Sequence, residues 1–484
     1  MAAGCRGNFR KKLFGGLRLV KLPFRPGAHR SSFEIDMTNG PLVGKTIRFA
    51  IPLALSGILQ LLFNAADIIV VGQFVGSQAL AAVGSTSALI NLIVNLFIGL
   101  SVGTNVLVAQ YYGASDTKAL RETVHTSVLA SLIFGAIVMV IGMVLAAPLL
   151  ELMGTPQEVL DQACLYMRIY FIGMPASMLY NFGAAILRAV GDTQRPLYFL
   201  FLAGVVNVLL NLFFVIVLHM GVEGVAIPTV ISQCVSAGLV LLCLVRSHTA
   251  YQVDLRQLRI KRDKLMGMVK IGLPAGIQGC SFSISNVLIQ SSINSFGAVA
   301  MAGNTAASNI EGFVSTAMDA FSQAALSFTG QNMGAGKLKR VNRILPLCLL
   351  LVTGVGLALG IGSYLLGSQL LGIYSSEADV IAFGLRRMSV VCILECFGGM
   401  MGVMVGVLRG MGYSFVPMAI TIGFVCGFRV IWLFTVFAQW PTLEVLYMSY
   451  PITWGLAAFF DGVCYFLVRR HLGKKRRLAN ESRP

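Results

Sequence analysis

Apolar runs of roughly twenty residues recur along nearly the whole chain, and this feature limits the fold more than any other. Clear examples are Leu89–Ala109, Val128–Leu149, Tyr198–Leu218, Leu345–Leu366 and Ile420–Ala438. Inside a bilayer each run must hydrogen-bond its own backbone, which continuous apolar segments of this length do as helices. The alternating pattern of transmembrane barrel strands is absent from the sequence. The chain is therefore predicted to be an all-α membrane protein with about twelve transmembrane helices.

The composition excludes several classes of protein. Only 12% of the 484 residues are charged, against about 25% in typical soluble domains. The net charge of +17 does not indicate nucleic-acid binding, because Lys and Arg gather at helix ends and in the two tails. The ten Cys are scattered without a C-x-x-C pair or a nearby His, so we expect small core residues and no metal site. No hydrolase, zinc-protease, nucleotide-binding or kinase motif is present, and we expect neither enzyme activity nor a cofactor.

The turns between the expected spans alternate in charge. One set carries Lys or Arg and comprises Asp116–Arg121, Arg188–Arg195, Arg246–Lys270, Lys337–Arg343, Arg409–Ser414 and the tail from Arg469. The intervening turns carry neither residue. By the positive-inside rule this pattern places both termini in the cytoplasm of a multi-pass protein of the inner (plasma) membrane. The stretch before Ile47 is basic and lacks the apolar core of a signal peptide, so we expect a cytoplasmic tail.

The second half of the chain repeats landmarks of the first. Gln110–Ala114 returns as Gln331–Ala335, and Leu187–Gly191 returns as Leu408–Gly412 (331 − 110 and 408 − 187 both give 221). We predict two homologous six-helix bundles, 46–245 and 266–470, with a connector at 246–265 and basic tails at 1–45 and 471–484. Both bundles then have the same orientation and face each other across a cleft at the membrane midplane, an arrangement suited to alternating access.

Ionisable side chains inside the spans are functional candidates, since each is costly in a bilayer. In the first half, Asp67 interrupts an apolar run, and such a carboxylate can take up H⁺ or ligate Na⁺. Asn207 and Asn211 lie one helical turn apart, and Thr229 falls in the next span. These four residues are our candidate cation-coupling site. The alternatives are a partly hydrated helix end for Asp67 and interhelical hydrogen bonding for the others.

In the second half, the candidates for the substrate cleft are Glu311, Asp319, Glu395 and Arg429. Glu311 and Asp319 are about two helical turns apart on one face. Carboxylates beside aromatic and Met side chains favour lipophilic cations. Arg429 is expected to pair with an acid across the cleft. Arg188 and Arg409, by contrast, are read as helix caps and membrane anchors.

These landmarks resemble the multidrug and toxic compound extrusion (MATE) family over nearly the whole chain after the basic tail. The residues that carry the resemblance are Pro52 with Asp67 and Val71-Gly72, Gln110–Ala114, Leu187–Pro196, Gln331–Ala335 and Leu408–Pro417. The resemblance implies a MATE/MOP-type fold and an antiporter that exports lipophilic organic cations or drugs in exchange for Na⁺ or H⁺. It also assigns Asp67 as the coupling carboxylate, with Asn207, Asn211 and Thr229 around it.

The sequence departs from part of that family. Asn211 stands where some members have Asp, Cys280–Ser285 lacks an acid found in others, and Gly402 occupies a position where many relatives carry one. A sodium site of the fully acidic type is therefore in doubt. The main alternative is a flippase or exporter of a lipid-linked saccharide or unknown metabolite. The expected partners are small organic cations and the lipid bilayer, with the protein acting as a monomer.

Overall fold

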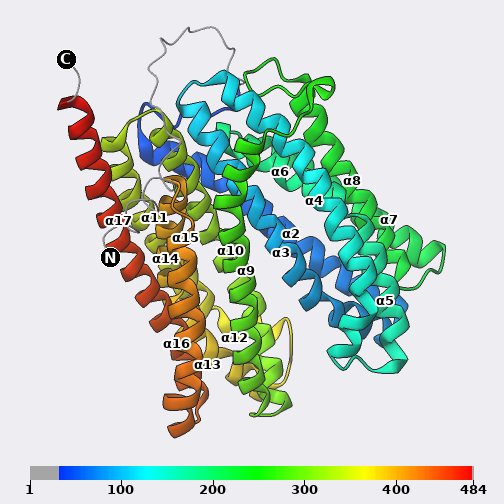
Figure 1. The fold of residues 1–484 in the computed structure, drawn as a ribbon. Helices are drawn as coiled ribbons and strands as arrows, with labels where there is room; N and C mark the ends of the chain where they lie inside the picture. Colours follow the sequence, from blue (N-terminus) through cyan, green and yellow to red (C-terminus); the bar gives the residue numbers. More distant parts are fainter. Residues whose placement is uncertain (1–31, 482–484) are drawn as a thin grey trace, which may run out of the picture.

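The computed structural model describes residues 32–481, without the side chains of 77, 88 and 475–481. Most of the first predicted tail, 1–31, and the last residues, 482–484, lie outside the described part. Within it the regular structure is helical throughout, as the apolar runs predict (Figure 1). The first long helix begins at Leu42, four residues before the predicted start of the first bundle.

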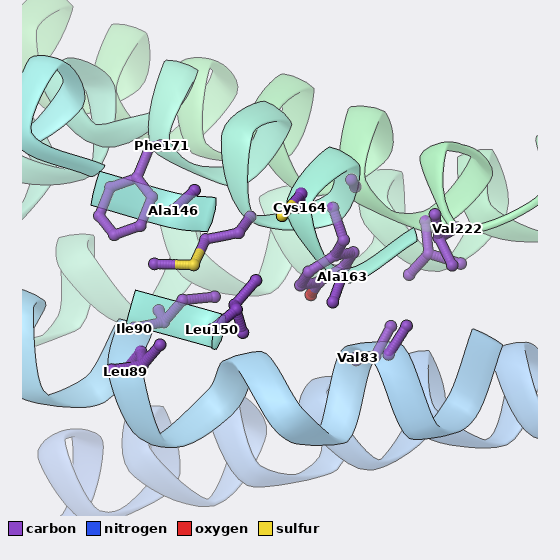
Figure 2. Close-up of a cluster of buried hydrophobic side chains, with 14 of the residues drawn as sticks. Val83, Leu89, Ile90, Ala146, Leu150, Ala163, Cys164, Phe171 and Val222 are labelled. Carbon is purple, nitrogen blue, oxygen red and sulfur yellow. The ribbon is translucent and has the colours of Figure 1, made fainter. Parts of the chain in front are cut away.

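The first half forms one bundle of helices. It comprises α2 (Leu42–Val70) continued by η1 (Val71–Val75), α3 (Ser77–Gly113), α4 (Thr117–Leu152), α5 (Gln157–Ile172) with α6 (Met174–Val190), α7 (Gln194–Leu212) continued by η2 (Phe213–Val217), and α8 (Glu223–Arg246). Apolar side chains from α3, α4 and α5 fill its interior, and Val222 joins them just before α8 (Figure 2). The polar residues of α2, α7 and α8 lie outside this apolar cluster.

A short 3₁₀ turn, η3 (Leu255–Gln257), lies in the connector to the second half. That half comprises α9 (Arg262–Asn294), α10 (Ala298–Gly334), α11 (Leu338–Leu365) with α12 (Gly367–Gly372), α13 (Ala378–Leu394) with α14 (Cys396–Gly410), α15 (Phe415–Ile420) continued through η4 (Thr421–Gly427), α16 (Phe428–Trp432) and η5 (Leu433–Phe437), and α17 (Leu443–Glu481).

The number of passages agrees with the prediction of about twelve. Nine described helical segments are long and apolar enough to cross a membrane, and the pair α5 and α6, bent by 47°, makes a tenth. The more polar α9 and α10, with 33 and 37 residues, are long enough to be the remaining two passages. Their polarity follows from their position, because both helices lie at the interface between the halves.

The two halves meet along α3 and α9, where glycines let the backbones touch. A Cβ atom added to Gly276 would lie 2.2 Å from the carbonyl oxygen of Leu96, and one added to Gly99 would lie 2.2 Å from the backbone nitrogen of Gly276. Further from the basic turns, Cys280 of α9 still contacts α3, since its thiol donates to the Leu92 carbonyl (3.4 Å). Beyond that level the helices of the two halves diverge (Figure 1).

This close approach gives a first prediction. Gly276→Ala should lower the thermal unfolding midpoint of the purified protein by several degrees, because a methyl group cannot fit against the Leu96 carbonyl and overpacking costs about 1–3 kcal/mol. The control is Gly354→Ala on α11, where an added Cβ meets nothing within 4 Å. Equal midpoints for the two variants would show that α3 and α9 do not touch in this way.

The repeated sequence motifs cross over between the halves at the end of the bundle that carries the basic turns, here called the basic end. Gln110 of α3 donates a hydrogen bond to the Gly410 carbonyl of the second half (3.0 Å), and Gln331 of α10 donates to the Ala189 carbonyl of the first (2.7 Å). Gly113 also touches the Gln331 carbonyl, while Gly334 touches the Gln110 carbonyl. The halves are therefore closed against each other at the basic end.

Candidate functional site

The first-half candidates form one connected network. Asp67 comes from α2, Asn207 and Asn211 lie one turn apart on α7, and Thr229 comes from α8. The Asn211 amide donates to Asp67 Oδ1 (2.5 Å) and also to Asn207 Oδ1 (3.3 Å). The Asn207 amide in turn donates to the Thr229 hydroxyl (3.4 Å). The structure thus brings together all four residues that the sequence singled out in this half.

The charge of Asp67 is not neutralised by a neighbouring cation. Within the described part of the chain its hydrogen-bond partner is a neutral amide, and none of the ion pairs includes it. The amide oxygen of Asn211 is buried without a hydrogen-bond partner among the described residues. An orphaned buried oxygen next to a carboxylate is costly. A proton or a cation shared between these oxygens would offset that cost.

In the second half, Glu311 is held in a buried ion pair that the sequence did not reveal. Arg387 of α13 reaches Glu311 of α10 with Nη2 (2.6 Å) and Nε (3.0 Å), and both side chains are largely buried. The Arg387 Nη1 donates to Asn304 (2.8 Å), while the guanidinium lies 5.2 Å from the ring centre of Tyr450. Glu311 is therefore neutralised and is less available to a ligand than the sequence suggested.

Glu395 and Arg429 also lie in this half, and no hydrogen bond or ion pair joins them within the described chain. The Ser315 hydroxyl donates to Glu395, whose second carboxylate oxygen is buried without a partner in the described residues. Arg429 donates to Thr453 (3.3 Å) and Ser285 (3.2 Å) and stacks 4.2 Å from the ring centre of Tyr450. Within the described chain its contacts are hydroxyl groups, the Asn286 amide and an aromatic face, and the acid partner expected from the sequence is not among them.

Asp319 differs from the other acids because it faces open space. It lies in the middle of α10, and its exposed side chain lines a cavity of about 270 Å³. No hydrogen bond or ion pair to Asp319 is found within residues 32–481. Arg409 lines the same cavity and donates to Gln278 (2.7 Å). Phe282, Met401 and Leu326 supply apolar surface.

The sequence analysis did not single out Asp461, and it gave Arg409 only a structural role. Asp461 of α17 is fully buried, and neither carboxylate oxygen has a hydrogen-bond partner within the described chain. Arg409 is the cation whose charge acts on it. The sequence signal for Asp461 was an acid inside the last apolar run, whereas Arg409 was read as a helix cap because it ends a span. Because Arg409 lines the cavity, it belongs to the candidate site together with Asp319.

A comparison with family models matches the MatE family at residues 52–213 and 274–433, one stretch in each half. The probable multidrug resistance protein YpnP of Bacillus subtilis is 30% identical over 381 residues, 78% of this chain and 84% of that protein. The probable multidrug resistance protein YoeA of the same organism is 27% identical over 420 residues, 84% of this chain and 90% of that protein. A FAD transporter of Shewanella oneidensis is 24% identical over 428 residues, 86% and 92% of the two chains.

Solved structures share the fold. A crystal structure of MATE in complex with MaL6 superimposes with a TM-score of 0.85 at 23% identity, covering 90% of this chain and 98% of that one. An outward-facing MATE family transporter of the MOP superfamily gives a TM-score of 0.83, also at 23% identity, covering 92% and 98%. At these identities the likeness concerns the arrangement of the helices.

Proposed function

This chain belongs to the MatE family of membrane transporters, the MATE family, and from that premise we propose that it is an antiporter that exports organic cations in exchange for H⁺. Membership makes it a multi-pass membrane transporter and not an enzyme. The proposal concerns what the transporter carries and what drives it. We further propose that the basic end faces the cytoplasm, as the positive-inside rule predicts.

The observation that carries the proposal is the unneutralised carboxylate of Asp67. A partly buried acid whose described partner is a neutral amide is expensive in a membrane, so such a residue is retained for a function. When Asp67 takes up a proton, its charge disappears and its new O–H can donate to the orphaned Asn211 oxygen after that amide turns over. Proton binding and proton release therefore change the connections between α2 and α7.

H⁺ is the favoured coupling ion because few oxygen atoms remain for Na⁺. Hard cations bind several oxygen ligands, whereas this network holds a single carboxylate. Two of its other oxygens, Asn207 Oδ1 and Thr229 Oγ1, already accept hydrogen bonds within the network. The presence of Asn211 in place of a second acid supports the same choice.

The cargo is assigned to the cavity around Asp319. An unpaired carboxylate beside Phe282 and Met401 matches the chemistry of a lipophilic cation, which gains charge pairing together with contact to aromatic and thioether surface. The cavity is lined by residues of α9, α10 and α14, all of them in the second half. Names of relatives as multidrug resistance proteins agree with this class of cargo.

The experiment that tests the proposal is ethidium export from cells that express the chain. Export should stop when a protonophore collapses the proton gradient and should continue when external Na⁺ is replaced by choline. If export depended on Na⁺ and not on the proton gradient, the cargo would still be an organic cation but the coupling ion would be Na⁺. Absence of ethidium export despite normal membrane insertion would contradict the proposal that the cargo is an organic cation.

Asp319→Asn should weaken cargo binding without uncoupling transport. We expect the apparent KM for ethidium to rise by roughly tenfold, the effect of losing about 1.4 kcal/mol of charge pairing, while the dependence on the proton gradient is kept. Asp379→Asn is the matched control, because Asp379 is exposed at the start of α13. An unchanged KM in Asp319→Asn would place the cargo elsewhere.

A second cargo class, an organic anion such as a phosphorylated metabolite, is favoured by one observation. Arg429 is buried without a carboxylate among its described contacts, and Arg409 has a buried Nε without a hydrogen-bond partner. A relative named a FAD transporter belongs to the same set of matches. Loss of anion export in Arg429→Gln, together with absent ethidium export, would favour this class and the lipid-linked alternative.

A further inference from the structure

The segment before the first long helix crosses from one half of the protein to the other. Residues 33–40, here called the strap, lie at the basic end immediately before α2. In Figure 1 this blue start of the described chain lies at the end of the bundle to which the C-terminal part of α17 runs. The first residues of the strap contact the N-terminal half, and the later ones contact the C-terminal half. The strap therefore joins two bodies that are expected to move apart during transport.

Attachment to the first half depends mainly on Glu34. Its carboxylate accepts hydrogen bonds from the hydroxyls of Tyr112 at the end of α3 (2.8 Å) and of Tyr251 in the connector (2.7 Å). Burial, followed by the Glu34 charge, raises the pKa of the Tyr251 hydroxyl, which keeps it a proton donor. The Ile35 N–H also donates to the Gly191 carbonyl (3.2 Å).

The position of Gly191 makes this attachment specific. Gly191 has a φ of +104°, and a Cβ added there would lie 2.5 Å from the carbonyl oxygen of Ile35. A glycine is therefore needed both for the left-handed turn after α6 and for the approach of the strap. The motif that contains it is the first copy of the repeat, and in the second copy Gly412 meets no strap atom within 4 Å.

Attachment to the second half is more extensive. The Met37 side chain is fully buried in an apolar cluster that includes Phe328 of α10 and also Phe49 of α2, whose rings meet edge to face at 5.6 Å. Asn332 donates to the Met37 carbonyl (3.1 Å) and Lys337 to the Thr38 carbonyl (2.9 Å). Arg340 donates to the carbonyls of Met37, Asn39 and Gly40. These bonds hold the strap to α10 and α11.

We propose that the strap is a latch of the basic end, which stays on the C-terminal half while Glu34 releases Tyr112 and Tyr251 as the two halves separate. Opening at this end must part Gln110 from Gly410 and Gln331 from Ala189, and the strap spans the same division. Within the described chain, the first-half attachment has a few hydrogen bonds and a cation–π contact of Arg195 with the Phe33 ring (5.6 Å), and it yields because the second-half attachment includes a fully buried side chain. The latch adds to the stability of the state that is closed at the basic end.

The test measures how often the basic end opens. Ser327 of α10 is fully buried at the interface of the halves, where it donates to Asn105 of α3 (3.2 Å). A Ser327→Cys reporter is placed in a full-length chain whose ten native Cys are replaced. Its reaction with a membrane-impermeant maleimide is followed in inside-out vesicles. This readout requires neither cargo nor coupling ion, so its failure is distinct from failure of the proposed function.

The informative variant is Tyr112→Phe with Tyr251→Phe, which removes two hydroxyls; the one on Tyr251 also accepts from Arg195 (3.3 Å). We expect the labelling rate to rise by roughly tenfold, because hydrogen bonds to a carboxylate that are lost from the closed state alone shift the equilibrium by that order. The matched control is Tyr198→Phe, since Tyr198 is exposed and makes no hydrogen bond among the described residues. Labelling that stays at the control rate would overturn the latch.

A single substitution covers the case in which the double variant fails to insert. Glu34→Gln keeps the size of the side chain and one acceptor oxygen but removes the charge that strengthens both hydrogen bonds. It should also raise the labelling rate, by less than the double variant. Lys339→Ala, an exposed neighbour of the Lys337 and Arg340 anchors, should leave the rate unchanged. A Glu34→Gln rate equal to that of Lys339→Ala would likewise overturn the latch.

Discussion

We expect Asp67→Asn to abolish proton-driven export while the protein still inserts and folds. Asparagine keeps the size of the side chain and can still accept the hydrogen bond from Asn211. It cannot take up or release a proton, so gradient-driven ethidium export is expected to fall to background. The measurement is the initial rate of export at equal amounts of protein in the membrane.

The control for this variant is Asp161→Asn. Asp161 is an exposed acid on α5 outside the Asp67 network, and its replacement should leave export unchanged. A second readout separates coupling from binding, because Asp67→Asn should still bind ethidium in detergent when the cavity around Asp319 is intact. Export by Asp67→Asn at the wild-type rate would rule out the coupling role.

Glu311→Ala is expected to destabilise the second half strongly. It leaves the buried guanidinium of Arg387 without its carboxylate, and breaking a buried ion pair from one side costs about 3–5 kcal/mol. We expect a large fall in the thermal midpoint in detergent, together with reduced yield. Removing both charges in Glu311→Leu with Arg387→Met should recover most of the loss, since the cost comes from the unpaired charge.

An exposed ion pair nearby provides the comparison. Arg386, the neighbour of Arg387, reaches Glu444 at 3.6 Å, and both side chains are more than half exposed. Glu444→Ala should therefore change the stability by about 1 kcal/mol at most. If Glu311→Ala were as mild as Glu444→Ala, or if the double variant were no better than the single one, the pair would not be buried in the folded protein.

The helical architecture was predictable because a bilayer restricts the choices of the chain. Apolar runs and alternating basic turns are set by local composition, and the repeat offset links the two halves. The first-half network was predictable for a similar reason, since Asn207 and Asn211 share a helical face and few other polar residues lie in those spans. Their connection to Asp67 needs only that α2 and α7 be neighbours, as the structure has them.

The second half was harder to predict because its polar residues pair over long sequence distances. Arg387 is 76 residues from Glu311, and no periodicity connects them. The sequence grouped Glu311, Asp319, Glu395 and Arg429 in one cleft, whereas Asp319 alone of these lines the cavity of about 270 Å³. The strap lay inside a predicted tail, where composition gives charge but not the contacts of individual residues.

The crossed glutamines have a consequence for how such a chain arose. Gln110 contacts Gly410 and Gln331 contacts Ala189, and these partners are also 221 residues apart (410 − 189). Reciprocal contacts of this kind define an isologous interface, the type that joins the subunits of a twofold-symmetric dimer. An ancestral half-length protein could use one surface to pair with a second copy of itself. Gene fusion would then preserve that interface, and the two copies of the motif must continue to evolve as complementary partners.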